Sequence, residues 1–254
     1  MMIQLESLTF RYASGVPIFK DFNWSIERGQ AWAVLGPSGC GKTTLLYLLA
    51  GLRFPDEGRV LIDGEVLARP RPHTGLILQD YGLLPWATVK QNAELGQRVR
   101  GFYGPDGKHA PQDFKASVHV EAWLERLGLS AIKDKYPGQI SGGQRQRTAI
   151  ARTLTLGPDL LLMDEPFSSL DAPTREGLQN LILELWQEQA LTLVIVTHAI
   201  EEAAVLGRKI LLLGRPPSTQ AVSIDNPGAG QPGFRESQAY LNLCRNLRGR
   251  MEAR

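Results

Sequence analysis

Cysteine is scarce in this sequence, with Cys40 and Cys244 the only two among 254 residues. Two cysteines do not supply the disulfide framework of a small secreted domain, so a reducing compartment is expected. Long apolar stretches are also missing, because no segment reaches the roughly 18 apolar residues of a membrane-spanning helix. The first residues, MMIQLESLTF, lack the charged and apolar parts of a secretion signal. We therefore expect a cytosolic protein unless another molecule holds it at a membrane.

A large excess of charge of either sign is absent as well. Lysine and arginine number 28 and aspartate and glutamate 26, which gives a net charge of +2. Proteins that bind nucleic acid usually carry a strongly basic surface, and this balance does not predict one. Nucleic acid is therefore not expected as a partner. The length and the 43% hydrophobic composition allow one substantial core with an additional subdomain.

What the sequence does contain is a glycine-rich segment at residues 36–44, GPSGCGKTT. It fits G-x-x-x-x-G-K-[ST], a loop whose N–H groups wrap a polyphosphate, whose lysine reaches the terminal phosphates and whose hydroxyl binds Mg²⁺. Glycine is needed where the backbone turns with φ > 0 and comes close to the phosphate oxygens. The nucleotide-binding residues predicted here are Gly36, Pro37, Ser38, Gly39, Cys40, Gly41, Lys42, Thr43 and Thr44.

The flanking sequence predicts how this loop is set in the fold. An apolar run of strand type, residues 31–36, precedes it, and an apolar run of helical length, residues 44–52, follows it. Later strands and helices alternate, which indicates an α/β core around a parallel sheet, whereas the first thirty residues alternate as antiparallel strands do. We predict an α/β fold: a phosphate-loop NTPase (RecA-like) core with a parallel sheet, an N-terminal antiparallel β-subdomain and an inserted helical subdomain.

Changes in composition along the chain also suggest domain boundaries. One domain is expected at residues 1–215, with its helical subdomain at approximately residues 86–152. Within that subdomain, residues 101–111 hold three glycines and two prolines, which predicts a loop. Residues 216–254 are predicted to be a linker followed by a short amphipathic helix at residues 235–248.

Two acidic residues follow a buried type of strand. The apolar run LLLM ends in Asp164 and Glu165, and ligands of open α/β sheets bind at the carboxyl ends of the strands. Asp164 is therefore placed to hold Mg²⁺, and Glu165 to polarise the attacking water as general base. His198 ends the next apolar strand and is expected at the same site. The alternatives are a helix-capping acidic pair and a histidine satisfied in the core.

With these motifs in this order, the chain resembles the nucleotide-binding subunits of ABC transporters over almost all of residues 2–215. The resemblance implies that residues 1–215 form an ABC-type ATPase domain that binds and hydrolyses ATP with Mg²⁺. The matching residues are Tyr12, which would stack on adenine; the Walker A segment GPSGCGKTT; Gln79 of the Q-loop; the signature ISGGQRQR; the Walker B run LLLMDE; SLD of the D-loop; and the switch histidine His198. It further implies a catalytic set of Glu165, His198 and Gln79, and a metal set of Thr43, Gln79 and Asp164. Ile140 stands where the signature usually has leucine, a volume-conserving difference.

The signature provides a second place for phosphate. A serine hydroxyl and glycine N–H groups at a helix N-terminus favour an anion, and the residues concerned are Ser141, Gly142, Gly143 and Gln144. One nucleotide cannot reach both phosphate sites of a chain if they lie far apart. The resemblance therefore implies a head-to-tail dimer, either a homodimer or a pseudo-symmetric pair. In it, each ATP lies between the Walker A loop of one chain and the signature and Asp171 of the other.

The segment QDYGLLPW, residues 79–86, resembles that of importers for nitrate, sulfonates, taurine and pyrimidine vitamin precursors. This implies transmembrane permease subunits, a periplasmic or extracellular solute-binding protein, a small anionic or vitamin-precursor solute, and a place in the cytoplasm on the inner face of the membrane. An exposed aromatic cluster normally marks an interface. Tyr81, Leu83, Leu84 and Trp86 are therefore predicted to receive a helix of the permease, with core packing as the alternative.

Other functions stay open at this point. An exporter subunit would use the same motor sequence, and the transported solute does not touch this subunit. An ABC-type ATPase without a membrane partner, such as a translation factor or a DNA-repair ATPase, would carry a second motif set, coiled coils or CxxC pairs, and this sequence has none of them. A phosphate-loop kinase would not explain ISGGQ or His198. The role of the C-terminal helix, and whether the dimer pairs identical chains, are also open.

Overall fold

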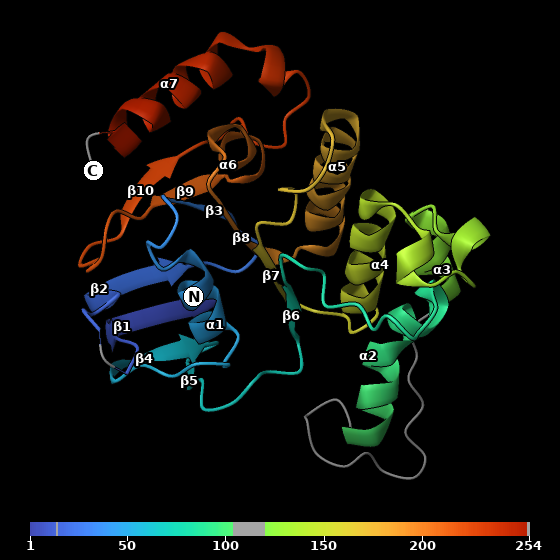
Figure 1. Ribbon diagram of the computed structural model, residues 1–254. Coiled ribbons are helices and arrows are strands. Elements are labelled where there is room, and N and C mark those ends of the chain that lie inside the picture. The colour runs from blue at the N-terminus through green and yellow to red at the C-terminus, as the bar shows by residue number, and fades with distance from the viewer. Residues whose placement is uncertain (14, 104–119, 253–254) are drawn as a thin grey trace.

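The computed structural model describes residues 1–13, 15–103 and 120–252, and the strands within them form two sheets (Figure 1). The larger, six-stranded sheet has the order β10-β9-β3-β8-β7-β6, and all neighbours run parallel except the antiparallel pair β10 and β9. Its central strands are buried along their whole length, which explains their continuous apolar sequences. The strands are β3 (Ala31–Leu35), β6 (Thr74–Ile77), β7 (Leu160–Asp164), β8 (Thr192–Thr197), β9 (Lys209–Leu212) and β10 (Val222–Asp225).

The N-terminal sheet is antiparallel, as the sequence predicted. Its order is β2-β1-β4-β5, formed by β1 (Ile3–Phe10), β2 (Phe19–Ile26), β4 (Glu57–Ile62) and β5 (Glu65–Val66). Side chains of β2 are buried on one side and exposed on the other, because only one face of this sheet packs on the core. The predicted class, an α/β phosphate-loop fold with an antiparallel subdomain, is confirmed.

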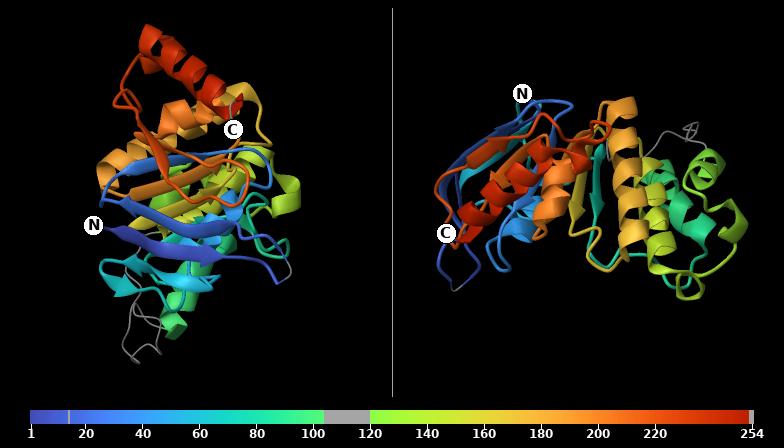
Figure 2. Two further views of the ribbon diagram at one scale, coloured as in Figure 1. Left: turned by 90° about the vertical axis from the view of Figure 1, so that its left-hand side faces the viewer. Right: turned by 90° about the horizontal axis from the view of Figure 1, so that it is seen from above.

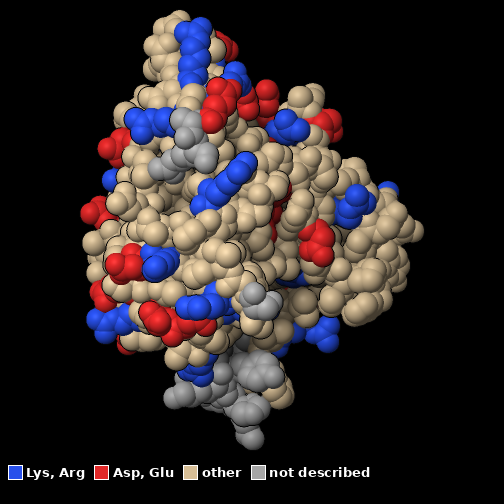
Figure 3. All heavy atoms as spheres, turned by 60° about the vertical axis from the view of Figure 1, so that its left-hand side comes forward, with Lys and Arg blue, Asp and Glu red and all other residues tan. Residues whose placement is uncertain are grey.

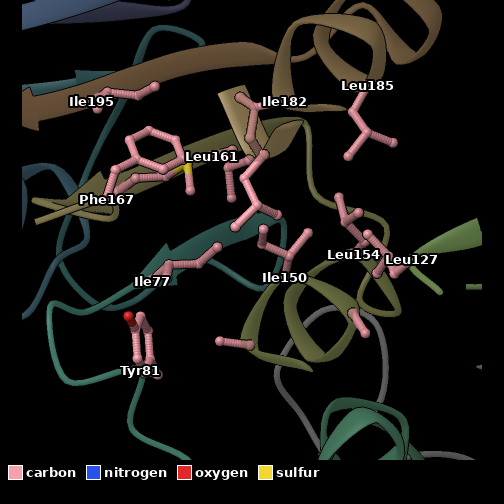
Figure 4. Close-up of a cluster of buried hydrophobic side chains, with 14 of the residues drawn as sticks. Ile77, Tyr81, Leu127, Ile150, Leu154, Leu161, Phe167, Ile182, Leu185 and Ile195 are labelled. Carbon is pink, nitrogen blue, oxygen red and sulfur yellow. The ribbon is translucent and has the colours of Figure 1, made fainter. Parts of the chain in front are cut away.

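Successive side chains of the central strand β7 pack into two different hydrophobic clusters. On β7, Leu161 and Met163 join the cluster that also holds α4 (Gly142–Leu154) and α5 (Ala172–Gln189), part of which is drawn in Figure 4. Leu160 and Leu162 point the other way, into a cluster with the N-terminal sheet and α1 (Lys42–Leu49). Since successive side chains of a strand face opposite sides, α1 and α4 cover opposite faces of the six-stranded sheet.

The helical subdomain lies on one side of the sheet and is built around α2 (Val89–Tyr103), α3 (Val120–Arg126) and α4 (Figures 1 and 2). The loop predicted at residues 101–111 begins later than expected, because α2 continues to Tyr103. Residues 104–111 lie outside the described residues. Two short 3₁₀ turns, η1 (Ser130–Ile132) and η2 (Pro137–Gln139), lead from α3 to the start of α4.

The C-terminal segment departs from the predicted linker and helix. Residues 222–225 form β10, which extends the sheet at its edge, and the buried amide of Asn226 donates to the carbonyls of Ala204 and Gly207. A short 3₁₀ turn, η3 (Phe234–Glu236), then precedes α7 (Gln238–Glu252), so the long helix begins later and ends later than predicted. Helix α7 packs against α6 (Ile200–Leu206) through Cys244 and Leu247. The sequence missed β10 because an edge strand of four residues between proline- and glycine-rich segments has little periodicity to detect.

A charged network ties the two sheets together just before β7. Arg71 holds both carboxylate oxygens of Asp159, with Nη2 2.6 Å from Oδ2, and the same nitrogen lies 3.3 Å from Asp63 in the turn between β4 and β5. Arg28 donates to Asp63 at 2.5 Å. Burial alone would raise the pKa of Asp159, but the hydrogen bonds and charge of Arg71, with Arg28, outweigh it and lower that pKa.

We expect Asp159→Asn to lower the free energy of unfolding by about 1–2 kcal/mol at pH 7, because a half-buried bidentate ion pair is lost. A carboxyl group whose pKa is lower in the folded than in the unfolded state stabilises the fold fully only above its unfolded pKa, about 3.9. This stabilisation is lost as the pH falls through the folded pKa. The difference between wild type and variant should therefore shrink at about pH 3. Urea unfolding at both pH values measures it. Asp225→Asn is the control, because Asp225 is highly exposed; equal losses in both variants would contradict the prediction.

Candidate nucleotide-binding and catalytic site

The glycine-rich loop lies between β3 and α1, as the sequence predicted, and its shape depends on glycine. Gly39 and Gly41 have φ of +78° and +102°. A Cβ on Gly41 would lie 2.4 Å from Ile18 Cγ2, and one on Gly36 would lie 2.6 Å from Cys40 Sγ. Helix α1 starts at Lys42 without a side-chain cap, so its first N–H groups are available to an anion. The loop therefore fits a phosphate chain.

Lys42 is buried at the base of this loop. Its Nζ donates to the carbonyls of Gly36 at 2.9 Å and Pro37 at 3.1 Å, and lies 3.7 Å from Glu165 Oε1. The ammonium is thus held by the loop itself, which fixes its charge beside the free N–H groups. Cys40 is buried here too, and burial raises the pKa of its thiol, which agrees with a small space-filling side chain.

Oxygen atoms suited to a hard cation gather beside the loop. Thr43 Oγ1 donates to Asp164 Oδ1 at 3.2 Å, and both residues line a pocket with the exposed Gln79. Burial raises the pKa of Asp164, and the hydrogen bond from Thr43 opposes that shift. A cation bound nearby would favour the ionised form of this carboxyl group. Within the described residues, no group of three or more His, Cys, Asp or Glu could hold a metal. One carboxylate, one hydroxyl and one amide suit Mg²⁺, which takes few protein ligands and completes its shell with phosphate and water.

Glu165 and His198 meet at the carboxyl edge of the sheet. Strands β7 and β8 pair in parallel with Asp164 opposite Val196, so the residues that follow each strand lie side by side. His198 Nδ1 is 3.0 Å from Glu165 Oε2, while the other carboxylate oxygen faces Lys42. Glu165 has a left-handed φ of +43°, and its N–H donates to the Val196 carbonyl. Such backbone conformations in non-glycine residues cluster at functional sites.

Tyr12 is brought to the same loop from the end of the N-terminal sheet. Its hydroxyl lies 3.1 Å from Thr44 Oγ1, and its ring packs edge-on against Phe10 with Arg53 over it. The side chain is 44% exposed, so part of it is accessible next to the phosphate loop.

The signature residues lie elsewhere. Ser141 caps α4: its Oγ accepts the N–H of Gln144 at 3.3 Å, and the Gln144 side chain accepts the N–H of Ser141 at 2.9 Å. Asp171 caps α5 in the same way, by accepting from Thr174. Gly143 is buried, and a Cβ there would lie 2.5 Å from Thr174 Cγ2, so the two helix starts are packed together. Gly142 lies in the first turn of α4.

The predicted site residues thus form two groups. The structure brings together Tyr12, the loop residues 36–44, Gln79, Asp164, Glu165 and His198. Ser141, Gly142, Gly143 and Gln144 lie apart from this group at the start of α4, which covers the opposite face of the sheet from α1, and Asp171 lies at the start of α5. Helices α1 and α4 stand apart in both Figures 1 and 2.

The segment after Gln79 is only partly the exposed groove that the sequence suggested. Tyr81 is 7% exposed, and its hydroxyl lies 2.7 Å from Ser169 Oγ, so it belongs to the core, as Figure 4 shows. Leu83 packs against the same core. Trp86 is 74% exposed. The sequence also missed Arg152, which holds the carbonyls of Tyr81 and Gly82 and so fixes this segment against α4.

The sheet, the loop between β3 and α1, and the acidic residue ending β7 define a phosphate-loop nucleoside triphosphatase. The chain belongs to the ABC transporter family, whose sequence model matches residues 19–168. It is 41% identical over 201 residues to the taurine import ATP-binding protein TauB of Pseudomonas aeruginosa, covering 79% of this chain and 73% of that protein. It is 37% identical over 240 residues to the aliphatic sulfonates import ATP-binding protein SsuB of Bacillus anthracis, covering 94% and 90%.

A solved structure adds a view of the reaction cycle. The chain resembles a dimeric ATP-binding cassette in a post-hydrolysis state with ADP and Pi bound, at 28% identity and a TM-score of 0.74, covering 88% of this chain and 98% of that one. The protein is an ATP-binding ATPase of this family. Its predicted resemblance to the sulfonate and taurine importers is confirmed.

Proposed function

We propose that this chain is the ATP-hydrolysing subunit of an importer and drives uptake of a small anionic solute through separate permease subunits. The observation that carries the proposal is the cluster of Lys42, Glu165 and His198 beside the Thr43–Asp164 pair, at the edge of the sheet where the phosphate loop opens. Relatives named as import proteins for taurine and sulfonates support the direction of transport and suggest a sulfonate as the solute.

The residues of this cluster suggest a division of labour. Thr43, Asp164 and Gln79 would hold Mg²⁺, which when bound would neutralise and orient the phosphates of ATP. Lys42 brings a fixed positive charge to the terminal phosphates, and the N–H groups of α1 add to it. Glu165 orients a water molecule and accepts its proton. His198 holds one oxygen of that carboxylate through its bond to Oε2, so Oε1, 3.7 Å from Lys42, is the oxygen that would turn toward the water.

A dimer completes the site. Because α1 and α4 cover opposite faces of the sheet, the nucleotide on the loop of one protomer would be covered by the α4 start of a second. Ser141 is exposed at the tip of α4, and Asp171 lies next to it at the start of α5. The dimeric, nucleotide-bound structure of the similar cassette supports this arrangement. Tyr12 would stack on the adenine of the same ATP.

Attachment to a membrane would come from the permease. Within the part of the chain that the structure describes, no helix is both long and apolar enough to cross a bilayer. Acidic and basic side chains alternate over the face in Figure 3, which offers no single-sign field there. We propose that the chain sits in the cytoplasm on the inner face of the membrane, that Trp86 is a main contact with the permease, and that a separate solute-binding protein delivers the solute.

We expect Trp86→Ala to weaken co-purification with the permease about 30-fold, because truncating an aromatic anchor at an interface typically costs about 2 kcal/mol or more. The melting temperature of the isolated subunit should not change, since the side chain is 74% exposed. Tyr81→Ala is the matched control from the same segment: it empties a buried site and should cost about 3 kcal/mol of stability. A Trp86→Ala subunit that binds the permease normally would exclude this contact.

A further inference from the structure

Glu202 is a buried carboxylate in an otherwise apolar part of α6. Its side chain is 8% exposed, and Oε2 accepts a 2.7 Å hydrogen bond from Thr197 Oγ1. The same Thr197 hydroxyl accepts the N–H of Ala199 at 3.0 Å. His198 is therefore flanked by two residues whose positions depend on the bond to Glu202.

Arg175 reaches this carboxylate from α5. Its Nη2 donates to the carbonyl of Leu170 at 2.7 Å, and its backbone N–H donates to that of Asp171 at 2.9 Å. Its Nε is buried, lies 3.8 Å from Glu202 Oε1, and has no hydrogen-bond partner among the residues that the structure describes. The guanidinium thus connects the segment of residues 169–171 to α6. It binds the Leu170 carbonyl by a hydrogen bond and Glu202 by an ion pair that is too long to be one.

A buried ion pair of this kind is not needed for the stability of the fold. Burial raises the pKa of Glu202, and the Thr197 bond and the charge of Arg175 only oppose that shift. Well-packed apolar residues in place of a buried ion pair are often as stable or more stable, and the neighbours Ala203, Ala204 and Val205 are buried and apolar. The pair connects two segments that both meet the nucleotide in the proposed function: residues 169–171 and the histidine.

We propose that Glu202 and Arg175 are positioning residues that couple the residues 169–171 segment to His198. Movement of this segment against a second protomer pulls on Arg175 through the Leu170 carbonyl. Arg175 shifts Glu202, Glu202 shifts Thr197, and the histidine then adjusts its bond to Glu165. Neither residue touches ATP. The proposal rests on the proposed roles of Glu165 and His198.

The test is Glu202→Gln, which keeps the shape and the oxygen that accepts from Thr197 but removes the charge that faces Arg175. We expect kcat for ATP hydrolysis to fall about 10-fold or more, with KM and melting temperature nearly unchanged, because small displacements of catalytic groups reduce rate rather than binding. Glu201→Gln is the control: it lies next to Glu202 on α6, is exposed and pairs with Arg248, and should change neither constant.

Arg175 offers a second position for substitution, because its side chain is less buried than that of Glu202. Arg175→Met should match the kcat of Glu202→Gln, and the double variant should be no slower than either single one, since both remove one connection. Additive losses, equal rates in Glu202→Gln and Glu201→Gln, or a fall in kcat that follows a fall in melting temperature would each overturn the inference. If Glu165→Gln keeps full activity, the proposed function fails instead; if Glu165→Gln is inactive while Glu202→Gln is normal, only the coupling fails.

Discussion

Glu165→Gln should slow ATP hydrolysis by about 10² to 10⁴-fold, the range expected for loss of a general base, while ATP affinity stays nearly unchanged. The amide keeps the shape of the side chain and a donor or acceptor toward His198, but it cannot take a proton from water. In this variant Lys42 still lies beside residue 165 and the Thr43–Asp164 pair is unchanged, so the groups expected to contact phosphate are preserved. Single-turnover hydrolysis and calorimetric titration with ATP measure the two quantities separately.

The same variant tests the dimer. With hydrolysis blocked, ATP should accumulate between two protomers, and light scattering should show a shift from monomer to dimer that depends on ATP. Glu184→Gln is a suitable control, because Glu184 lies on α5 away from the loop and its replacement should affect neither turnover nor assembly. Turnover near that of the wild type would remove Glu165 from the mechanism, and a Glu165→Gln protein that stays monomeric with ATP would contradict the shared site.

Lys42→Ala should weaken ATP binding by at least about 100-fold, equivalent to about 2.7 kcal/mol. Its ammonium is buried and fixed by two loop carbonyls. Without it, the phosphates would meet two carbonyl oxygens and the carboxylate of Glu165 with no cation between them, and charge-assisted hydrogen bonds are among the stronger polar contacts. Fluorescence titration with a labelled ATP analogue gives the dissociation constant.

Lys90→Ala is the matched control for this loss, because Lys90 is a lysine on the surface of α2 that pairs with Glu121. Its removal should leave the dissociation constant within about two-fold of the wild type, because Lys90 pairs with Glu121 of α3 and not with a residue of the phosphate loop, and loss of an exposed ion pair changes stability little. Unchanged binding by Lys42→Ala would count against the assignment of the phosphate loop.

The parts of the site that lie close together in sequence could be predicted from it. The loop at residues 36–44 is a continuous pattern between an apolar strand and an apolar helix, and both are present as β3 and α1, although α1 begins and ends earlier than the predicted residues 44–52. Asp164 at the end of β7 follows the same logic, because a buried strand ending in an acid needs no long-range information. The parallel core and the antiparallel N-terminal strands were also accessible, since hydrophobic periodicity separates buried strands from half-buried ones.

Features that depend on how the segments come together could not be predicted. The bond between His198 and Glu165 requires β7 and β8 to be neighbours, which periodicity does not state. Tyr81 lies next to exposed residues in sequence, but its hydroxyl finds Ser169 and it is buried. The pairing of Arg175 with Glu202 joins two helices. Strand β10 pairs with the edge of β9, a contact that the local sequence does not state.

The alternation along β7 has a consequence for how this protein can change over time. Its even-numbered residues face α1 and end in Asp164, and its odd-numbered residues face α4 and α5. Inserting or deleting one residue in the strand would exchange the two sets and turn the Asp164 carboxylate away from Thr43. Apolar substitutions of similar volume are tolerated at such positions, so the strand can vary in composition among descendants but not in length.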